Sequence, residues 1–374
     1  MTTPMRHALV VFLATMLLGV GGFAIAAYQI WTYPERPDGR VDTQVEIEIP
    51  RGVTAKGVSN LLEEAELIRS PLLFRLYTTQ RGAAARIRPG QYTFEPGVTP
   101  KQLVDTLVKG VADVLVTVTI PEGKTFVEIA EILEDAKVTT KEAFVAQAID
   151  KAFLRSIDVP ALSIEGYLFP DTYRLRPGTP ADEVALTLVR RHRRVFEELR
   201  TENAKSLAKV RSKLDLTDHQ IVILASIVEK ETAQIDERPT IAQLYLNRLT
   251  FPNFQPRILQ ADPTIIYGCT VAPLATKRIS DACAQFKDNN IRTIHLRDVD
   301  NEYNTYTNAG MPPGPIGNPG RGSLAAVMDP DGSRYLYFVA SGGGRHFFST
   351  NEQDHEAAVV KYQRGGRPMP GSSR

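Results

Sequence analysis

The 374-residue chain has little of several features that mark specialised protein classes. It has two cysteines, Cys269 and Cys283, with no CxxC pair and no histidine at metal-ligand spacing, so we expect no metal site. Its formal net charge is only +1, whereas a surface that tracks nucleic-acid phosphates leaves a large basic excess. A nucleic-acid partner is therefore not expected. In an oxidising compartment the two cysteines can close a local disulfide, and in a reducing one they are incidental.

Long apolar runs are also absent, with one exception at the N-terminus. Residues 8–28 are almost uninterruptedly apolar, long enough at 1.5 Å per residue to cross a hydrocarbon core, and Trp31 and Tyr33 follow at the expected interface. We predict a cytoplasmic stub at 1–7, a transmembrane helix at 8–28 and a linker at 29–43. The alternative is a cleaved signal peptide, with Ala24 and Ala26 as small residues near a cleavage site.

After the linker the sequence contains an internal repeat. Residues 49–54 (IPRGVT) and 120–125 (IPEGKT) each combine a strand end, a turn and a threonine that can cap the amphipathic helix that follows, and residues 95–99 form a weaker copy. We predict one such module at 44–112 and a second βα segment at 113–160. These units resemble LysM-like glycan-binding modules, and the alternative is a compact spacer between membrane and catalytic unit.

The stretch from Thr217 to Leu249 holds the candidate chemistry. Thr217 and Gln220 form a capping-box pattern, and residues 221–228 are apolar on every side, which predicts a buried helix. That helix delivers Glu229, Lys230 and Glu231 at its end, where burial of charge is costly unless the charge is paired or used.

The two glutamates are not equivalent, because residues two apart on a helix point to roughly opposite sides. Glu231 is expected to lie above Ile227 and Val228 and below Ile235, in an apolar surrounding that raises a carboxyl pKa, so it is the better candidate for a general acid. The alternative is that both carboxylates end the helix and pair with Lys230 or Arg238.

The remaining sequence, 161–364, is expected to form an α+β catalytic domain, because helical and strand patterns occur in blocks. Residues 165–173 (EGYLFPDTY) form either a sugar-holding aromatic surface or a well-packed turn. Residues 335–340 predict a strand that pairs with 346–350 across Gly342–Gly344, and 310–320 form a rigid turn-rich loop suited to lining a cleft. Residues 365–374 are expected to form a disordered tail.

Several motifs in a fixed order carry a family resemblance. SIVEKET (226–232), QxDPTxxYG (260–268), YNTY (303–306), GxPPGPIxNPG (310–320) and YLYFVA (335–340), together with EGYLFPDTY, resemble the endolytic murein transglycosylases, the MltG or YceG-like family. The resemblance covers nearly the whole chain. The segment 250–257 and the loop between the two cysteines depart from the family pattern and flank the expected cleft.

The resemblance implies a single-pass protein of the bacterial inner membrane whose catalytic domain faces the periplasm. It implies a lyase without cofactors that cuts peptidoglycan strands internally, ends glycan elongation and partners penicillin-binding-type synthases. Glu231 would protonate the bond between MurNAc and GlcNAc and then take the proton of the MurNAc 6-hydroxyl, which closes a 1,6-anhydro ring. The candidate substrate-binding residues are Glu229, Gln260, Asp262, Thr264, Tyr267, Tyr303, Asn304 and Tyr306.

Two alternatives remain at the sequence level. One is a hydrolytic muramidase that uses Asp262 or Glu229 as a second carboxylate. The other is a non-catalytic scaffold that binds peptidoglycan beside the synthetic machinery. The end of the product distinguishes the two enzymes, because hydrolysis leaves a reducing end and transglycosylation an anhydro end. Replacement of Glu231 by Gln should abolish the activity of an enzyme and leave the function of a scaffold intact.

Overall fold

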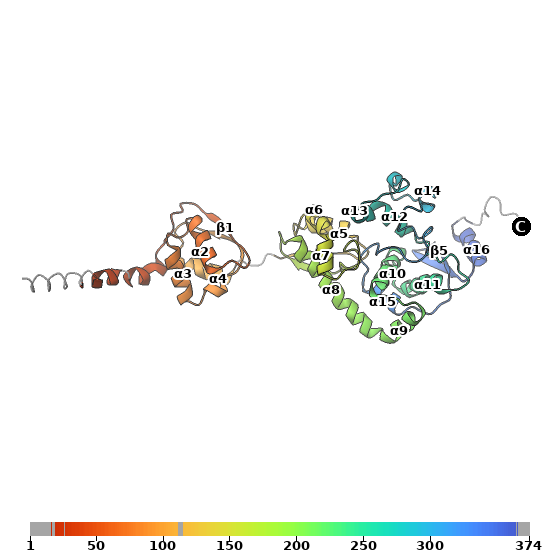
Figure 1. The fold of residues 1–374 in the computed structure, drawn as a ribbon, viewed down its shortest axis with the longest axis horizontal. Helices are drawn as coiled ribbons and strands as arrows, with labels where there is room; N and C mark the ends of the chain where they lie inside the picture. Colours follow the sequence, from red (N-terminus) through yellow and green to blue (C-terminus); the bar gives the residue numbers. More distant parts are fainter. Residues whose placement is uncertain (1–15, 17–18, 26, 111–114, 364, 366–374) are drawn as a thin grey trace, which may run out of the picture. The chain divides into compact units, whose positions relative to one another are not determined.

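A computed structural model describes the chain except for residues 1–15, 17–18, 26, 111–114, 364 and 366–374. The described residues divide into two compact units, 1–113 and 114–374, which we describe separately (Figure 1). About half of the predicted membrane segment 8–28 lies outside the described residues, and the stub 1–7 lies wholly outside them, as does nearly all of the tail 365–374. Within the described part, no helix has the length and apolarity that a membrane crossing requires.

Unit 1 is a two-stranded sheet covered by helices. Antiparallel strands β1 and β2 pair from Val45↔Phe94 to Ile49↔Gly90, and α2 and α3 lie between them in the chain, which gives the order strand–helix–helix–strand. Tyr92, Phe74 and Leu62 are fully buried in its core. The elements are η1 (Tyr33–Glu35), β1 (Val45–Ile49), α2 (Ala55–Glu64), α3 (Pro71–Gln80), η2 (Ala84–Arg86), β2 (Gly90–Phe94) and α4 (Pro100–Lys109).

Unit 2 begins with the second strand–turn–helix segment. Its strand β3 pairs antiparallel with β4, from Val116↔Leu175 to Thr119↔Thr172, so this segment shares one small sheet with the residues that follow the EGYLFPDTY motif. The helices pack on a common core that extends into the first half of α8. The elements are β3 (Val116–Thr119), α5 (Phe126–Asp135), α6 (Lys141–Ala148), α7 (Lys151–Ser156), β4 (Thr172–Leu175) and α8 (Ala181–Glu202).

The rest of unit 2 is built around α10. This helix packs against α11 and α15, with α12 nearby, and the antiparallel hairpin β5–β6 packs against α16 (Figure 1). The elements are α9 (Ala204–Lys213), α10 (Asp218–Glu231), η3 (Ile235–Glu237), α11 (Arg238–Thr250), α12 (Asp262–Thr270), α13 (Ala272–Thr276), η4 (Cys283–Gln285), α14 (Thr293–Leu296), α15 (Arg321–Met328), β5 (Tyr337–Gly342), β6 (Arg345–Ser349) and α16 (Glu352–Tyr362).

The threonines of the internal repeat cap helices as expected. Thr54, Thr99 and Thr125 each accept a hydrogen bond from the backbone N–H three residues later, at the start of α2, α4 and α5. The structure thus confirms the strand–turn–helix interpretation of all three copies. The EGYLFPDTY segment forms a packed turn: Glu165, Leu168 and Phe169 lie in the interior.

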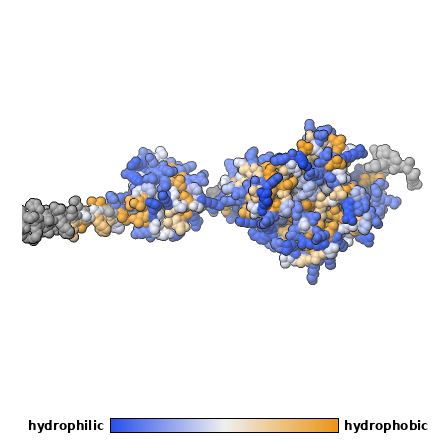
Figure 2. Space-filling model, in the orientation of Figure 1, coloured by the Kyte–Doolittle hydropathy of each residue, from blue (hydrophilic) through white to orange (hydrophobic). Residues whose placement is uncertain are grey.

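Figure 2 shows a mainly hydrophilic face on both units, with apolar side chains interspersed, which suits a chain with 44 basic and 43 acidic residues. The exception is the described part of the N-terminal segment of unit 1, which precedes η1. Its apolar side chains are exposed, Phe23 at 78% and Trp31 at 81%, and such side chains require an apolar surrounding.

Candidate active site

Helix α10 carries the candidate acid at its C-terminal end. Thr217 and Gln220 form the expected capping box, with Gln220 N donating to Thr217 Oγ1 at 3.2 Å and Thr217 N donating to Gln220 Oε1 at 2.9 Å. Residues 221–228 are all buried, because α11 and α15 cover the helix. The helix ends at Glu231, and Thr232 is extended. The expected position of Ile235 below Glu231 was therefore wrong: Ile235 lies in η3 and is 73% exposed.

Glu231 is partly buried and holds one strong contact. The hydroxyl of Tyr245, on α11, donates to Glu231 Oε1 at 2.9 Å. Burial raises the pKa of Glu231 to about 7, with a further rise from the charge of Asp262 and opposing effects from the Tyr245 hydrogen bond and Arg248. A carboxyl with this pKa holds a proton near neutrality and can release it to a substrate, which is what a general acid requires.

Glu229, two residues earlier, has both oxygens occupied. Arg238 Nη2 donates to its Oε1 at 2.9 Å and Gly320 N donates to its Oε2 at 3.0 Å, and the Glu229 and Arg238 side chains are only 5% and 8% exposed. Burial raises the pKa of Glu229 against these contacts. Glu229 thus joins the end of α10 to α11 and to the start of α15. For Glu229, the structure shows the ion pair with Arg238 that the sequence offered as an alternative to a catalytic role.

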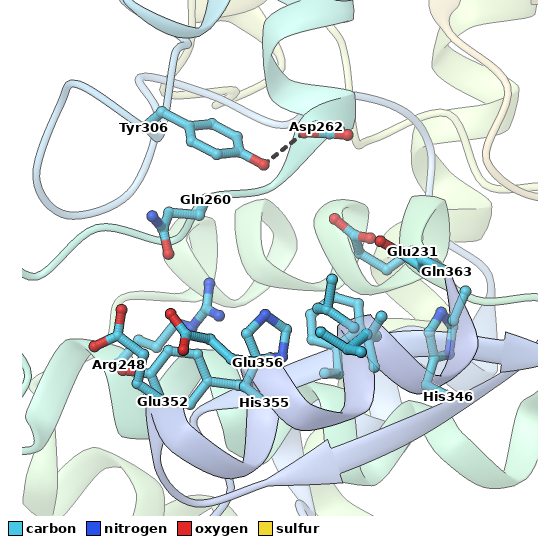
Figure 3. A pocket seen from close by; sticks show the side chains of 16 residues that line it. Glu231, Arg248, Gln260, Asp262, Tyr306, His346, Glu352, His355, Glu356 and Gln363 are labelled. Carbon is cyan, nitrogen blue, oxygen red and sulfur yellow. Dashed lines mark hydrogen bonds between the residues drawn. The ribbon is translucent and has the colours of Figure 1, made fainter. Parts of the chain in front are cut away.

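Glu231 opens onto a cleft of about 700 Å³. Figure 3 shows the side chains that surround it, with Tyr306, Asp262 and Gln260 on one wall and the β5–β6 hairpin and α16 on the other. The lining residues are Glu231, Arg248, Gln260, Asp262, Tyr306, Tyr337, Phe338, Val339, Ala340, His346, Glu352, His355, Glu356, Val359, Val360 and Gln363.

Four of the predicted site residues therefore meet in this cleft: Glu231, Gln260, Asp262 and Tyr306. The Tyr306 hydroxyl donates to Asp262 Oδ1 at 2.6 Å, and burial raises the pKa of Tyr306. Gln260 has a φ of +53° and its N–H donates to the carbonyl of Thr305, so the YNTY and QxDPT motifs are tied together at the cleft wall.

Four other predicted residues lie behind this wall. Thr264 Oγ1 lies 2.9 Å from Thr305 Oγ1 in the interior, and the Tyr267 and Tyr303 rings pack at a tilt with centroids 5.0 Å apart. Asn304 donates to the carbonyls of residues 295, 296 and 298. These side chains are buried, so the structure places Thr264, Tyr267, Tyr303 and Asn304 as supports of the cleft wall.

Cys269 and Cys283 form a disulfide in the structure. With Ile265 they make a small separate core, against which Phe286 and Tyr306 pack. The bridge therefore ties the C-terminal end of α12, whose first turn carries Asp262, to the loop that supports Tyr306.

Several cleft residues were not predicted from sequence. Arg248 donates to the carbonyls of Leu336 and Leu259, and its guanidinium lies over the Tyr337 ring at 5.8 Å. The C-terminal helix α16 was also missed as a cleft wall. Its contribution was visible in the spacing, because the residues that face the cleft recur at helical intervals: Glu352, His355, Glu356, Val359, Val360 and Gln363.

A second pocket, of about 440 Å³, lies on another side of Glu231. It is lined by Glu122, Gly123, Lys124, Glu128, Glu229, Lys230, Glu231, Thr232, Ala233 and Arg238. Glu231 is the residue that both pockets share, and a strand–turn–helix segment of the internal repeat supplies one wall of the second. Glu231 thus borders two pockets.

Comparison with known proteins identifies the family. Residues 47–361 match the family model described as YceG-like family. The chain belongs to the YceG-like family. It is 28% identical over 336 residues to a Bacillus subtilis (strain 168) protein named endolytic murein transglycosylase, which covers 86% of this chain and 85% of that one.

Two further comparisons agree with this YceG-like assignment. A Streptococcus pneumoniae (strain D39) protein with the same name is 28% identical over 382 residues, which covers 94% of this chain but 64% of that protein. The crystal structure of a putative yceG-like protein from Listeria monocytogenes superposes with a TM-score of 0.52 at 26% identity and covers 85% of this chain and 99% of that one. The mixed helix and strand content agrees with the α+β prediction.

Proposed function

We propose that this chain is an endolytic lytic transglycosylase that cleaves the bond between MurNAc and GlcNAc within peptidoglycan strands. The observation that carries the proposal is Glu231, a partly buried carboxyl with its pKa raised to about 7, held by Tyr245 and open to the cleft. The names of the Bacillus and Streptococcus relatives support the same activity.

In the proposed reaction Glu231 donates its proton to the glycosidic oxygen, and the C1–O4 bond breaks. The 6-hydroxyl of the same MurNAc then closes onto C1 and gives up its proton to a base of the enzyme, so that the new end is 1,6-anhydroMurNAc and no water is consumed. Burial of Glu231 favours this chemistry, because a desolvated carboxyl keeps its proton until the leaving oxygen takes it.

Internal cleavage is supported by the space on both sides of the acid. A strand cut within its length must occupy subsites on each side of the scissile bond, and Glu231 lines both the larger cleft and the second pocket. We infer that these two pockets hold the two sides of one strand. Cleavage within growing strands would end their elongation.

A hydrolytic muramidase is the second candidate, and Asp262 is the observation in its favour. Asp262 lies in the same cleft, and its charge raises the pKa of Glu231, so a second carboxylate is near the acid. Glu229 is a poorer candidate because Arg238 and Gly320 engage both of its oxygens.

We further infer that the chain acts at the outer face of the bacterial inner membrane. The exposed apolar side chains of the N-terminal segment support an anchor in residues 8–28, and the Cys269–Cys283 disulfide supports an oxidising periplasm. The strand–helix–helix–strand order of unit 1 supports a LysM-like glycan-binding module, and penicillin-binding-type synthases are the proposed partners.

Mass spectrometry of the products tests the reaction. The full chain in detergent is incubated with isolated glycan strands, in parallel with Glu231→Gln. We expect internal fragments with 1,6-anhydroMurNAc ends from the wild type and none from the variant. Reducing ends would show a muramidase, and strands left intact by folded wild-type protein would favour the scaffold.

A further inference from the structure

His346 lies in the cleft in a pairing that no sequence motif indicated. Its Nδ1 is 2.7 Å from Oε2 of Glu237, and its backbone N–H donates to Oε1 of the same carboxylate at 3.0 Å. Both side chains are largely buried, at 13% and 8% exposure. Glu237 therefore holds His346 by two contacts, from side chain and from backbone.

This pairing fixes the chemistry of the imidazole. A carboxylate only accepts hydrogen bonds, so Nδ1 of His346 carries the hydrogen and Nε2 of the neutral ring keeps its lone pair. Within the described residues Nε2 has no hydrogen-bond partner, and the residue lines the cleft. The ring is held by Phe338 and Phe348, with centroids at 5.2 and 6.3 Å. The arrangement presents a proton acceptor to whatever occupies the cleft.

The pair is linked to the end of α10, where the acid lies. Thr232 follows Glu231 directly, and its Oγ1 donates to Oε2 of Glu237 at 3.4 Å. Consecutive Cα atoms are about 3.8 Å apart, so the chain Thr232–Glu237–His346 begins beside Glu231. In Figure 3 Glu231 and His346 are drawn toward the same end of the cleft, whereas Arg248 and Glu352 lie toward the other.

The proposed reaction moves two protons, and the family resemblance assigns both transfers to Glu231. After the first transfer Glu231 is an anion that accepts a hydrogen bond from Tyr245 at 2.9 Å. That bond stabilises the anion and opposes burial, which is the larger effect and raises the pKa of Glu231. One carboxylate must make the two transfers in sequence, whereas a separate acceptor can take the second proton as the glycosidic bond breaks.

We propose that His346, oriented by Glu237, is a second catalytic residue that accepts the proton of the attacking MurNAc 6-hydroxyl. The inference rests on the proposed transglycosylase function. The proton of Glu231 goes to the leaving O4 of GlcNAc, the C1–O4 bond breaks, the O6–C1 bond forms and the O6 proton goes to Nε2. The imidazolium then returns its proton through solvent to the Glu231 carboxylate, and the enzyme is restored without consumption of water.

Kinetics of three variants test this assignment: His346→Ala, His346→Gln and Glu237→Gln. A positioned base contributes about 10²- to 10⁴-fold, so we expect kcat to fall at least about 100-fold in both His346 variants while KM changes less than about threefold. Glu237→Gln loses the carboxylate that selects the tautomer, and its kcat should fall similarly. Phe347→Leu, on the opposite face of β6, is the matched control and should keep wild-type rates.

Two readouts separate a base from a structural residue. Added imidazole should restore part of the His346→Ala activity and none of the Glu231→Gln activity. The pH dependence of kcat should also differ between the wild type and His346→Gln, because the variant has no imidazole in the cleft. The charged groups at the pair are Glu237 and Asp236 of η3 and Arg345 of β6, and all remain in that variant.

The outcomes are distinct from those that test the function itself. Anhydro ends from the wild type with His346 variants near wild-type kcat would overturn the assignment, as would a rise in KM alone. Reducing ends from the wild type would overturn the proposed function and the O6 step with it. Thermal unfolding of each variant excludes a loss of fold as the cause, and a His346→Ala that does not fold leaves the decision to His346→Gln.

Discussion

The Tyr245 hydroxyl donates a 2.9 Å hydrogen bond to Oε1 of Glu231, from the middle of α11 to the last residue of α10. This bond lowers the pKa of Glu231 against the larger effect of burial. Hydrogen bonds to charged groups contribute about 1.5–3 kcal/mol, or roughly 10- to 100-fold in rate.

Tyr245→Phe should therefore lower kcat by about 10- to 100-fold, because the Glu231 anion loses its donor. Without the bond the pKa of Glu231 rises further, so the alkaline limb of the pH–rate profile should move to higher pH. A profile that keeps its alkaline limb in place would show that Glu231 is not the group that titrates there.

Glu231→Gln should stabilise the protein at alkaline pH while it abolishes activity. The folded pKa of about 7 lies above the ordinary 4.5, so Glu231 opposes folding once pH rises above about 4.5 and fully above 7. The shift corresponds to about 3 kcal/mol. Urea unfolding should show equal stabilities at pH 4 and a more stable variant at pH 8, and equal stabilities at both would contradict the assigned burial.

Glu229→Gln should destabilise the protein, whereas Glu231→Gln should stabilise it at alkaline pH. It removes the buried partner of Arg238, and loss of one member of a buried ion pair costs about 3 kcal/mol or more. Glu122 offers the matched control, since it contacts the same guanidinium at 3.2 Å but is 46% exposed, and Glu122→Gln should cost under about 1 kcal/mol. Urea unfolding of the two variants measures the difference, and equal losses would refute it.

Much of the local structure could be predicted from sequence, because its causes lie within a few residues. Thr217 caps α10 through Gln220, Pro239 lies in the first turn of α11, and β5 pairs with β6 as expected, although β5 covers 337–342 rather than 335–340 and includes Gly342. Each of these depends on a capping box, a proline or a turn, and these can be recognised from neighbouring residues alone.

The tertiary partners of the site residues could not be predicted in this way. Glu229 meets the backbone of Gly320, 91 positions away, and Glu237 meets His346, 109 positions away. Membership in a motif also did not separate Asp262, which lines the cleft, from Asn304, which supports its wall. That distinction depends on whether a side chain points into the cleft or into the interior. Helix or strand periodicity does not predict the direction of a side chain in an irregular loop.

Replacement of Cys269 and Cys283 by Ser should destabilise the cleft wall and have little effect on the rate of the chemical step. The bridge spans 14 residues, for which the loss of the cross-link corresponds to about 3 kcal/mol. Because Tyr306 packs on this small core, substrate binding should weaken and KM should rise, with kcat changed little. In limited proteolysis, the double variant should be cleaved first within residues 270–290. An unchanged KM would show that the disulfide does not contribute to substrate binding in the cleft.

His192 should limit stability in acid. It is buried on α8 between Tyr167 and Phe196, and neither ring nitrogen has a hydrogen-bond partner among the described residues. Burial, with a smaller effect of Arg193, lowers the pKa of His192 to about 4. Its folded pKa lies below the ordinary 6.5, so stability is intact above pH 6.5 and is lost as pH falls toward 4, by up to about 3 kcal/mol.

His192→Phe removes that proton uptake and retains an aromatic ring in the same cluster. The variant should unfold at a lower pH than the wild type in an acid titration followed by circular dichroism. At pH 8 the two proteins should differ little, because the wild-type ring is neutral there. An acid midpoint that does not move would assign the acid sensitivity to groups other than His192.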